Sequence, residues 1–300
     1  MSQRILVTGG TGFIGQVLCP KLVAKGYSLT VLSRQSETDV RAACGRVEAI
    51  SNLELLREHP GFDGIINLAG EGIADKRWSQ QRKQVLRDSR IGLTCQLVSV
   101  VKSWDNKPGV LVSGSAVGYY GNQDSTLVNE ETPPNDEFTH RLCRDWEAEA
   151  VKLEAEGVRV CLSRTGVVAG PGGGFLQRML LPFRLGLGGR LGSGDQYMPW
   201  VHRDDVVAAL IFMLESGNAT GPYNVVSPNP VTNREFTRCL AATLKRPAIF
   251  PAPAPVLKLA LGEMSRLLLT GQQATPQRLL QQDFRFTYPD LAEALENCIR

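Results

Sequence analysis

A glycine-rich segment near the start of the chain has the spacing of a dinucleotide-binding loop. It reads TGGTGFIG from Thr8 to Gly15 and lies between a predicted strand and a predicted helix. Glycine permits a tight turn at Gly9, close approach of a pyrophosphate at Gly12, and close packing of the helix at Gly15. The start of that helix would add free N–H groups and partial positive charge. We therefore expect cofactor contacts from Gly9, Thr11, Gly12, Phe13, Ile14 and Gly15.

The residues after the second predicted strand indicate which dinucleotide binds. Sites specific for NAD place Asp or Glu there, about 20 residues beyond the glycines, to accept a hydrogen bond from a ribose 2′-hydroxyl. This chain has Ser33 and Arg34 instead, and a guanidinium can pair with a 2′-phosphate in a bidentate geometry. We therefore expect both residues to contact the cofactor, and the cofactor to be NADP. The alternatives are a glycine turn that binds nothing and a solvated loop arginine.

A third candidate segment follows the strand expected over 64–68. Residues 67–70 read NLAG, and their small side chains let the chain pass beside an adenosine and its ribose, with a plain β-turn as the alternative. The polar loop 71–78 comes next, and ligands of doubly wound sheets lie beyond the carboxyl ends of the strands. We therefore expect cofactor contacts from Leu68, Ala69, Gly70, Glu71 and, on the following helix, Arg90.

Alternating strands and helices must position these segments. Short apolar runs that stop at small residues predict buried strands, and apolar residues at helical spacing predict the helices between them. The alternation predicts an α/β fold with a Rossmann-type, doubly wound parallel sheet. Strands are expected over 4–8, 28–33, 64–68, 109–113, 158–163 and 223–226, and helices over 13–25, 79–104, 138–156, 204–215 and 233–244.

The second half of the chain contains segments rich in glycine and proline. Glycine-rich segments over 170–174 and 186–194 predict loops, and the prolines within 247–255 predict an extended linker. We expect residues 1–165 to form mainly the dinucleotide-binding domain, to which segments near 195–230 return. Residues 166–300 would then form mainly a smaller substrate-side domain with a C-terminal extension.

The composition narrows the class of protein. The 300 residues carry a net charge of +3, which gives no reason to expect a nucleic acid or a membrane surface as partner. Scattered cysteines without CxxC spacing fit reduced thiols, and no His or Cys has metal-ligand spacing. No apolar run reaches the roughly 18 residues of a membrane helix. We expect a cytoplasmic protein that acts on a small-molecule substrate and binds no metal. The sequence is compatible with a homodimer.

Several longer strings of residues resemble a known superfamily. The motifs TGGTGFIG and NLAG, together with SGSA at 113–116 and WVHRDD at 200–205, are similar to those of the extended short-chain dehydrogenase/reductases, which include sugar-nucleotide epimerases and dehydratases. A narrower, atypical group, the NAD(P)-dependent "epimerase family proteins" of unassigned activity, is still more similar. That resemblance implies NADP(H) binding, with Val168 among the contacts, and no established reaction. Its marks are the strings at 69–71, 76–78, 181–189 and 192–194.

The resembled superfamily uses a helix-borne pair of residues for proton transfer. Its Tyr gives or takes the proton, and a Lys four residues later lowers the pKa of that phenol and holds the nicotinamide ribose. The corresponding helix here offers Phe138 and Leu142 in one register, and Thr139 and Cys143 in the register shifted by one residue. Neither register supplies the acid or the lysine.

Two hydroxyl groups are the remaining catalytic candidates. Ser115 fits the superfamily's hydroxyl position, and Tyr119 follows it closely. Two functions therefore stay open: an NADP-dependent oxidoreductase or epimerase with an unknown small substrate, and a non-catalytic NADP(H)-binding module that senses redox state. An enzyme should have a pocket of about 300 Å³ or more, with convergent polar groups, beside the nicotinamide.

Overall fold

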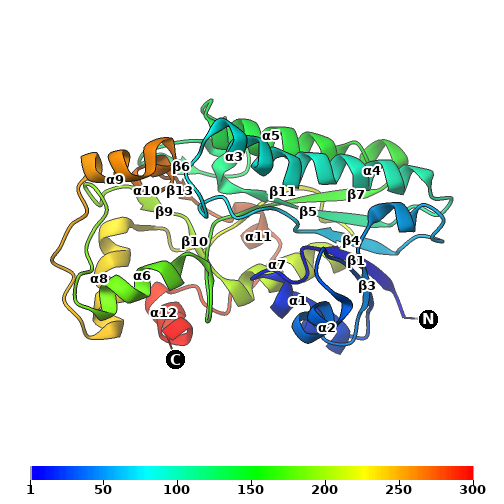
Figure 1. The fold of residues 1–300 in the computed structure, drawn as a ribbon, viewed down its shortest axis with the longest axis horizontal. Coiled ribbons are helices and arrows are strands. Elements are labelled where there is room, and N and C mark those ends of the chain that lie inside the picture. Colours follow the sequence, from blue (N-terminus) through cyan, green and yellow to red (C-terminus); the bar gives the residue numbers. More distant parts are fainter. Residues whose placement is uncertain (1, 300) are drawn as a thin grey trace.

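A seven-stranded parallel sheet forms the centre of the molecule (Figure 1). The computed structural model describes residues 2–299. The strand order is β11-β7-β5-β4-β1-β2-β3, so the order reverses between β1 and β4. This is the doubly wound α/β class that the sequence predicts, and that prediction is confirmed. The strands are β1 (Arg4–Thr8), β2 (Ser28–Leu32), β3 (Glu48–Ile50), β4 (Gly64–Asn67), β5 (Val110–Ala116), β7 (Arg159–Thr165) and β11 (Gly221–Val225).

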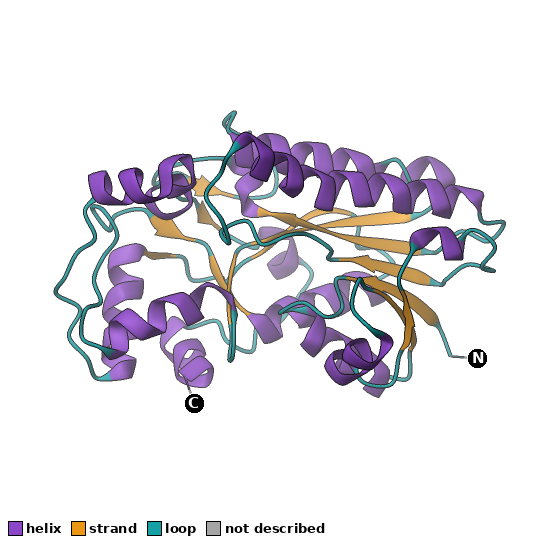
Figure 2. Cartoon of the chain, viewed as in Figure 1, coloured by secondary structure: helices purple, strands orange, loops and turns teal. Residues whose placement is uncertain are grey.

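Helices cover both faces of this sheet (Figure 2). The strands are apolar along most of their length, and every residue of β4 is buried, as expected for a parallel sheet that is covered on both sides. Two separate apolar cores join the sheet to its two layers of helices. One layer contains α1 (Gly15–Ala24), α2 (Glu37–Cys44), α7 (Arg203–Glu215) and α11 (Gln277–Gln281), and the other contains α3 (Gln80–Arg87), α4 (Leu93–Ser103) and α5 (Phe138–Val151).

The long helix predicted over 79–104 contains an irregular turn. A π-helical turn, Asp88–Gly92, separates α3 from α4. Such turns are rare and are found frequently at functional sites. This one contains Arg90, which the sequence predicts as a cofactor contact.

A smaller lobe is built mainly from the C-terminal half of the chain. Its helices α6 (Gly174–Arg184), α8 (Asn233–Leu244) and α12 (Leu291–Ile299) pack around a core in which Trp200 and Phe236 are fully buried. The chain also returns to the large sheet, because β11 pairs with β7. The remaining elements are β6 (Leu127–Val128), β8 (Val167–Ala169), β9 (Tyr197–Met198), β10 (Trp200–His202), β12 (Val231–Thr232), β13 (Gln273–Ala274), α9 (Ala254–Leu261) and α10 (Arg266–Leu269).

Several elements differ from the sequence-based expectations. The sequence does not predict α2, which is mostly polar and buries only Val40 and Cys44, although Ser36 caps it by accepting from the Asp39 N–H. Strand β3 is a three-residue edge strand. Helix α6 lies between the two glycine-rich segments expected as loops, and α9 begins inside the segment expected as a linker. Strand β3 is too short to show a period, whereas α6 does bury Leu176, Leu180 and Phe183 at helical spacing between its glycine-rich flanks.

Gly15 is required by packing at the start of α1. A Cβ atom added there would lie 2.3 Å from the Gly10 carbonyl oxygen and 2.4 Å from that of Gly9. Both atoms belong to the backbone of a tight loop, so the loop itself would have to move. We predict that Gly15→Ala lowers the free energy of unfolding by about 1–3 kcal/mol, as measured by urea unfolding.

Gly217→Ala is the matched control for this prediction. A Cβ atom at Gly217 would meet nothing within 4 Å, and Gly217 is not among the glycines with positive φ. This variant should be neutral or slightly stabilising, because alanine reduces the conformational entropy of the unfolded chain. Equal losses in the two variants would contradict the packing argument.

Candidate cofactor-binding and active site

The candidate site lies beyond the carboxyl ends of β1 and β4, where the strand order reverses and where doubly wound sheets bind ligands. A buried polar network fixes the two strand ends. The Thr8 hydroxyl donates to Asn67 Oδ1 at 2.6 Å and accepts from the Ala69 backbone N–H at 3.2 Å. The Asn67 amide donates onward to Thr94 Oγ1 of α4 at 2.9 Å. The 67–70 segment is thereby held beside the glycine loop.

The glycine loop leaves one side open. Gly9 has a φ of +72°, and a Cβ atom added there would lie 2.8 Å from the Leu68 carbonyl carbon and oxygen. At Gly12, an added Cβ would meet only the Gly9 carbonyl oxygen, at 3.2 Å. The Thr11 carbonyl oxygen accepts a hydrogen bond at 2.9 Å from the side-chain amide of Gln16 in α1. In the described part of the chain no side chain caps α1. The N–H groups of Phe13, Ile14 and Gly15 at its start have no acceptor there and are available for an anion.

Other predicted cofactor residues connect this loop to the elements around it. The Phe13 ring centroid lies 4.5 Å from the guanidinium carbon of Arg203, at the start of α7. Ile14 and Val168 of β8 are both partly buried against the same apolar core. The structure thus places Val168 on the side of the sheet that carries α1, although it is far from the glycine loop in sequence.

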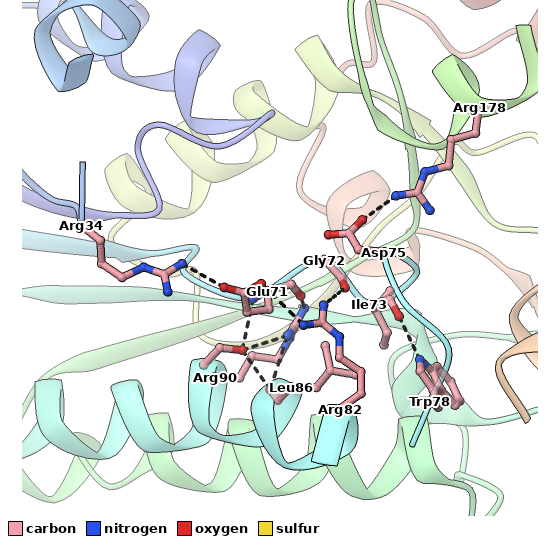
Figure 3. Close-up of polar contacts among 11 residues, drawn as sticks. Arg34, Glu71, Gly72, Ile73, Asp75, Trp78, Arg82, Leu86, Arg90 and Arg178 are labelled. Carbon is pink, nitrogen blue, oxygen red and sulfur yellow. Dashed lines mark hydrogen bonds and ion pairs between the residues drawn. The ribbon is translucent and has the colours of Figure 1, made fainter. Parts of the chain in front are cut away.

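Ser33 and Arg34 follow β2, and Arg34 forms an ion pair with Glu71 (Figure 3). Arg34 Nη2 donates to Glu71 Oε1 at 2.9 Å, and 90% of the Arg34 side chain is exposed. Arg82 of α3 approaches the other carboxylate oxygen at 3.7 Å. The hydrogen bond from Arg34, assisted by the charge of Arg82, lowers the pKa of Glu71. Glu71 is therefore a carboxylate held between one exposed and one buried guanidinium.

The polar loop 71–78 is tied to both parts of the molecule (Figure 3). Arg82 Nη2 donates to the Gly72 carbonyl at 2.6 Å. From the smaller lobe, Arg178 of α6 donates a hydrogen bond to the Ala74 carbonyl oxygen at 2.6 Å. Arg178 also forms an ion pair with Asp75. The loop therefore bridges the two lobes.

Arg90 reaches the same loop from the π-helical turn. Its Nη2 donates to the Glu71 carbonyl at 2.9 Å. A Cβ atom added at Gly70 would lie 3.0 Å from the Arg90 guanidinium carbon, so the glycine makes room for this side chain. The guanidinium carbon lies 5.5 Å from the Trp146 ring centroid. Burial lowers the pKa of Arg90, but a guanidinium remains charged in proteins.

Ser115, near the end of β5, belongs to a buried charged network. Its hydroxyl donates to Glu147 Oε1 of α5 at 2.6 Å. The same carboxylate accepts two hydrogen bonds from Arg164 of β7, from Nε and Nη2, each at 2.9 Å. The Arg164 and Glu147 side chains are 5% and 8% exposed. A bidentate pair fixes the carboxylate plane, and this gives the Ser115 hydroxyl a defined direction.

The second catalytic candidate, Tyr119, packs against this network. Its ring centroid lies 3.5 Å from the Arg164 guanidinium carbon, and its backbone carbonyl oxygen lies 2.7 Å from His140 Nδ1. The neighbouring Tyr120 hydroxyl accepts from Arg164 at 3.0 Å, and burial raises the pKa of Tyr120 to about 12. Within residues 2–299 the Tyr119 hydroxyl has no hydrogen-bond partner, so it is available to a ligand.

The two pairs of α5 residues that the sequence leaves open as alternatives face different parts of the molecule. Phe138 and Leu142 are buried in an apolar cluster with Leu86 of α3. The Phe138 ring centroid lies 5.0 Å from that of Trp78. These two positions therefore face α3 and the 71–78 loop.

Thr139 and Cys143 lie instead against the end of β5. The Thr139 Cβ would be 3.1 Å from a Cβ added at Gly118, in the turn that follows β5. Cys143 is close enough to Ser115 and Ala116 for both to affect the pKa of its thiol. Burial, followed by the charge of Glu147, raises the pKa of Cys143 to about 12, so its thiol stays protonated at neutral pH. The helix positions beside Ser115 are thus Thr139 and Cys143.

Residues 2–299 contain neither a candidate metal-binding cluster nor a helix that could span a membrane. No group of three His, Cys, Asp or Glu side chains in this range could hold a metal ion. None of the helices in this range is both long enough and apolar enough to span a bilayer. All seven cysteines of the sequence are free thiols.

Comparison with known proteins identifies the family. The model of the NAD dependent epimerase/dehydratase family matches residues 5–226, well over half of the sequence. The chain belongs to this family. A second model, a domain of unknown function (DUF1731), matches residues 252–298 of this epimerase-family chain. The resemblance stated from the sequence motifs is confirmed.

Individual relatives cover the whole epimerase-family chain. It is 36% identical to the epimerase family protein YfhF of Bacillus subtilis, over 99% of this chain and 98% of that protein. A crystal structure of human epimerase family protein SDR39U1 (isoform 2) with NADPH matches with a TM-score of 0.90 and 35% identity over 98% of each chain. UDP-N-acetylglucosamine 4-epimerase from Bacillus cereus shares the fold, with a TM-score of 0.77 and 20% identity over 98% of this chain and 97% of that one.

Sequence reasoning missed the residues that support the site. Arg164 stands near the end of the buried strand β7, and a buried charge needs a partner. That rule signals a partner for Arg164 but does not name Glu147. Arg178 was missed because no element was predicted between the two glycine-rich segments, so nothing in the sequence analysis positioned its side chain.

Glu147→Gln should destabilise the protein strongly. The variant leaves the buried Arg164 guanidinium without a counter-charge, and removing one partner of a buried pair typically costs about 3–5 kcal/mol. The free energy of unfolding from urea titration measures this loss. Glu149→Gln is the control on the same helix, because Glu149 pairs with the exposed Lys152 and should stay close to the parent protein. Similar losses in both variants would remove the special role of the buried pair.

Proposed function

We propose that this epimerase-family chain binds NADP(H) and acts on a small molecule as an oxidoreductase or epimerase. The observation that carries the cofactor assignment is Arg34, an exposed guanidinium at the end of β2. A 2′-phosphate beside Arg34 would accept its bidentate hydrogen bonds, in exchange for Glu71 or together with it. The NADPH in the human SDR39U1 structure supports this proposal.

The glycine loop fits the pyrophosphate of a dinucleotide. Gly12 leaves the outer side of the loop open, and the uncapped start of α1 offers N–H groups and partial positive charge. The 67–70 segment lies beside Gly9, where an adenosine can pass. The proposed cofactor contacts are Gly9, Thr11, Gly12, Phe13, Ile14, Gly15, Ser33, Arg34, Leu68, Ala69, Gly70, Glu71, Arg90 and Val168.

The catalytic part of the proposal rests on Ser115. When bound, NADP(H) would supply or accept a hydride, and the chain's own residues would position the substrate. The Ser115 hydroxyl donates its hydrogen bond to Glu147. The lone pairs of the Ser115 oxygen are therefore free to accept a hydrogen bond from a substrate hydroxyl. Arg90 supplies positive charge nearby, whereas the protonated thiol of Cys143 supplies none. Tyr119 offers a second hydroxyl.

A non-catalytic, redox-sensing role is the second candidate. The register of α5 favours it, since Thr139 and Cys143 place neither a phenol nor an ammonium group beside Ser115. A sensor needs the cofactor contacts but no proton donor with a pKa near neutrality.

We also propose a division of labour along the chain. Residues 1–165 and segments near 195–230 would hold the cofactor, and the rest of 166–300 would face the substrate. The pairing of β11 with β7 supports the return of the later segment to the sheet. We propose a cytoplasmic location, which the free cysteines support.

The chain should prefer NADPH over NADH by at least about tenfold, because a charge-assisted contact with the 2′-phosphate contributes on the order of 1.5–3 kcal/mol. Dissociation constants from calorimetry test this. Arg34→Ala should remove most of the preference and leave NADH binding intact. Arg41→Ala, which changes another exposed arginine after β2, is the control and should keep the preference. Equal affinities for the two dinucleotides in the parent protein would contradict the assignment.

Any activity found in a screen of sugar nucleotides, aldehydes and quinones with NADPH should depend on Ser115. We expect Ser115→Ala to lower the rate by about 10²-fold, because positioning is lost. Phe138→Tyr should have no effect, since Phe138 lies in the apolar cluster against α3. An unchanged rate in Ser115→Ala would remove Ser115 from the mechanism. Tight NADPH binding without any activity would favour the sensing role.

A further inference from the structure

A cavity in the smaller lobe collects three arginines. Its volume is about 430 Å³, and its lining includes Arg190, Arg234 and Arg238. Arg190 belongs to the glycine-rich segment that follows α6, and the other two lie on α8. Helix α8 is at the end of the molecule away from α1 and α2 (Figure 1). The dinucleotide loop therefore does not account for this cluster of positive charge.

The backbone around the cavity is firmly held. A Cβ atom added at Gly189 would lie 2.0 Å from the Phe250 carbonyl oxygen, so glycine is needed for the two segments to pair. The Arg190 carbonyl accepts from the proline-rich segment at 2.9 Å. The Leu191 N–H donates to Asn233 Oδ1 at 2.8 Å, which fixes the arginine segment to the start of α8. The positions of the arginine backbones are thus defined before any ligand binds.

The charge of the three arginines is only partly neutralised. Arg234 pairs with Asp195 at 2.6 Å. The side chains of Arg190 and Arg238 make no hydrogen bond or ion pair with another residue in the described part of the chain. Glu235, next to Arg234, is engaged in capping α8 through its bonds to Thr232. Glu235 keeps its charge near Arg238, and Asp195 lies near Arg190 as well as Arg234. Two carboxylates therefore face three guanidiniums, and the cavity keeps a net positive charge.

A buried hydroxyl in the cavity wall lacks a partner. Thr237 is 5% exposed, and its Oγ1 atom makes no hydrogen bond with any residue from 2 to 299. Buried polar side-chain atoms are nearly always hydrogen bonded, so a residue of the cavity wall has hydrogen-bonding capacity that the described part of the chain leaves unfilled. The remaining wall is apolar and contains Ile249 and Pro251.

We propose that this cavity binds a phosphate-bearing ligand. Guanidinium forks match the oxygen geometry of phosphate, and three of them suit a group with more than one negative charge. The Thr237 hydroxyl can complete the hydrogen bonding, and Ile249 and Pro251 can contact an apolar part of the ligand. Such a group occurs in free phosphorylated metabolites and in the headgroups of anionic lipids. The exposed side chains of Ile249 and Phe250, 70% and 54% accessible, make the lipid source worth testing.

The first arm of the experiment titrates the full chain with inorganic pyrophosphate in a calorimeter, at physiological salt and both with and without excess NADPH. The expected result is binding that persists with NADPH and weakens by at least about tenfold in the double variant Arg190→Gln and Arg238→Gln. Thr237→Val, which keeps the shape of the side chain, should weaken binding by a smaller factor. Arg46→Gln removes an exposed arginine outside the cavity and should bind as the parent protein does.

The second arm measures co-sedimentation with vesicles of phosphatidylglycerol or of phosphatidylcholine. Pyrophosphate binding that the double variant loses and Arg46→Gln keeps supports a free phosphorylated ligand. Binding to phosphatidylglycerol vesicles alone, lost in the same variant, supports a lipid headgroup. No binding to either probe, or an equal loss in Arg46→Gln, overturns the proposal. Because each titration is also run without NADPH, the result for pyrophosphate does not depend on whether the chain binds NADPH.

Discussion

The buried ion pair between Glu147 and Arg164 is the contact around which the candidate active site is arranged. It joins α5 to β7, and a buried pair of this kind is stable only when its remaining hydrogen-bonding capacity is filled. Ser115 and Tyr120 fill part of it, and the ring of Tyr119 covers the guanidinium. The side chains of Ser115, Tyr119 and Tyr120 therefore all take their direction from this ion pair.

The second constraint is the close approach of backbone segments at the glycine loop. It explains why the candidate cofactor site could be predicted from the sequence. The strands β1 and β4 are apolar runs that end at small residues, and Gly9, Gly12 and Gly15 restrict the turn between β1 and α1. These signals are local, because each depends on residues that are neighbours in the chain. The fold class and the position of the candidate site follow from them.

The parts that could not be predicted depend on contacts between distant residues. Periodicity alone cannot choose between Phe138 with Leu142 and Thr139 with Cys143, because both pairs have the same spacing on a helix. Packing against α3 makes the choice. The partners Arg178 and Asp75 are 103 residues apart, and nothing in the sequence near either one identifies the other.

The bridge formed by the 71–78 loop affects how easily the two lobes can separate. Arg178 and Asp75 are about half exposed, and ion pairs in such positions contribute only about 0–1 kcal/mol. Dissolved ions weaken them further, since charges in physiological salt are screened over about 8 Å. The contact between the 71–78 loop and α6 is thus weak. It can break without breaking the buried ion pair between Glu147 and Arg164. Added salt should therefore weaken this contact much more than the pair of Glu147 and Arg164, whose side chains are buried.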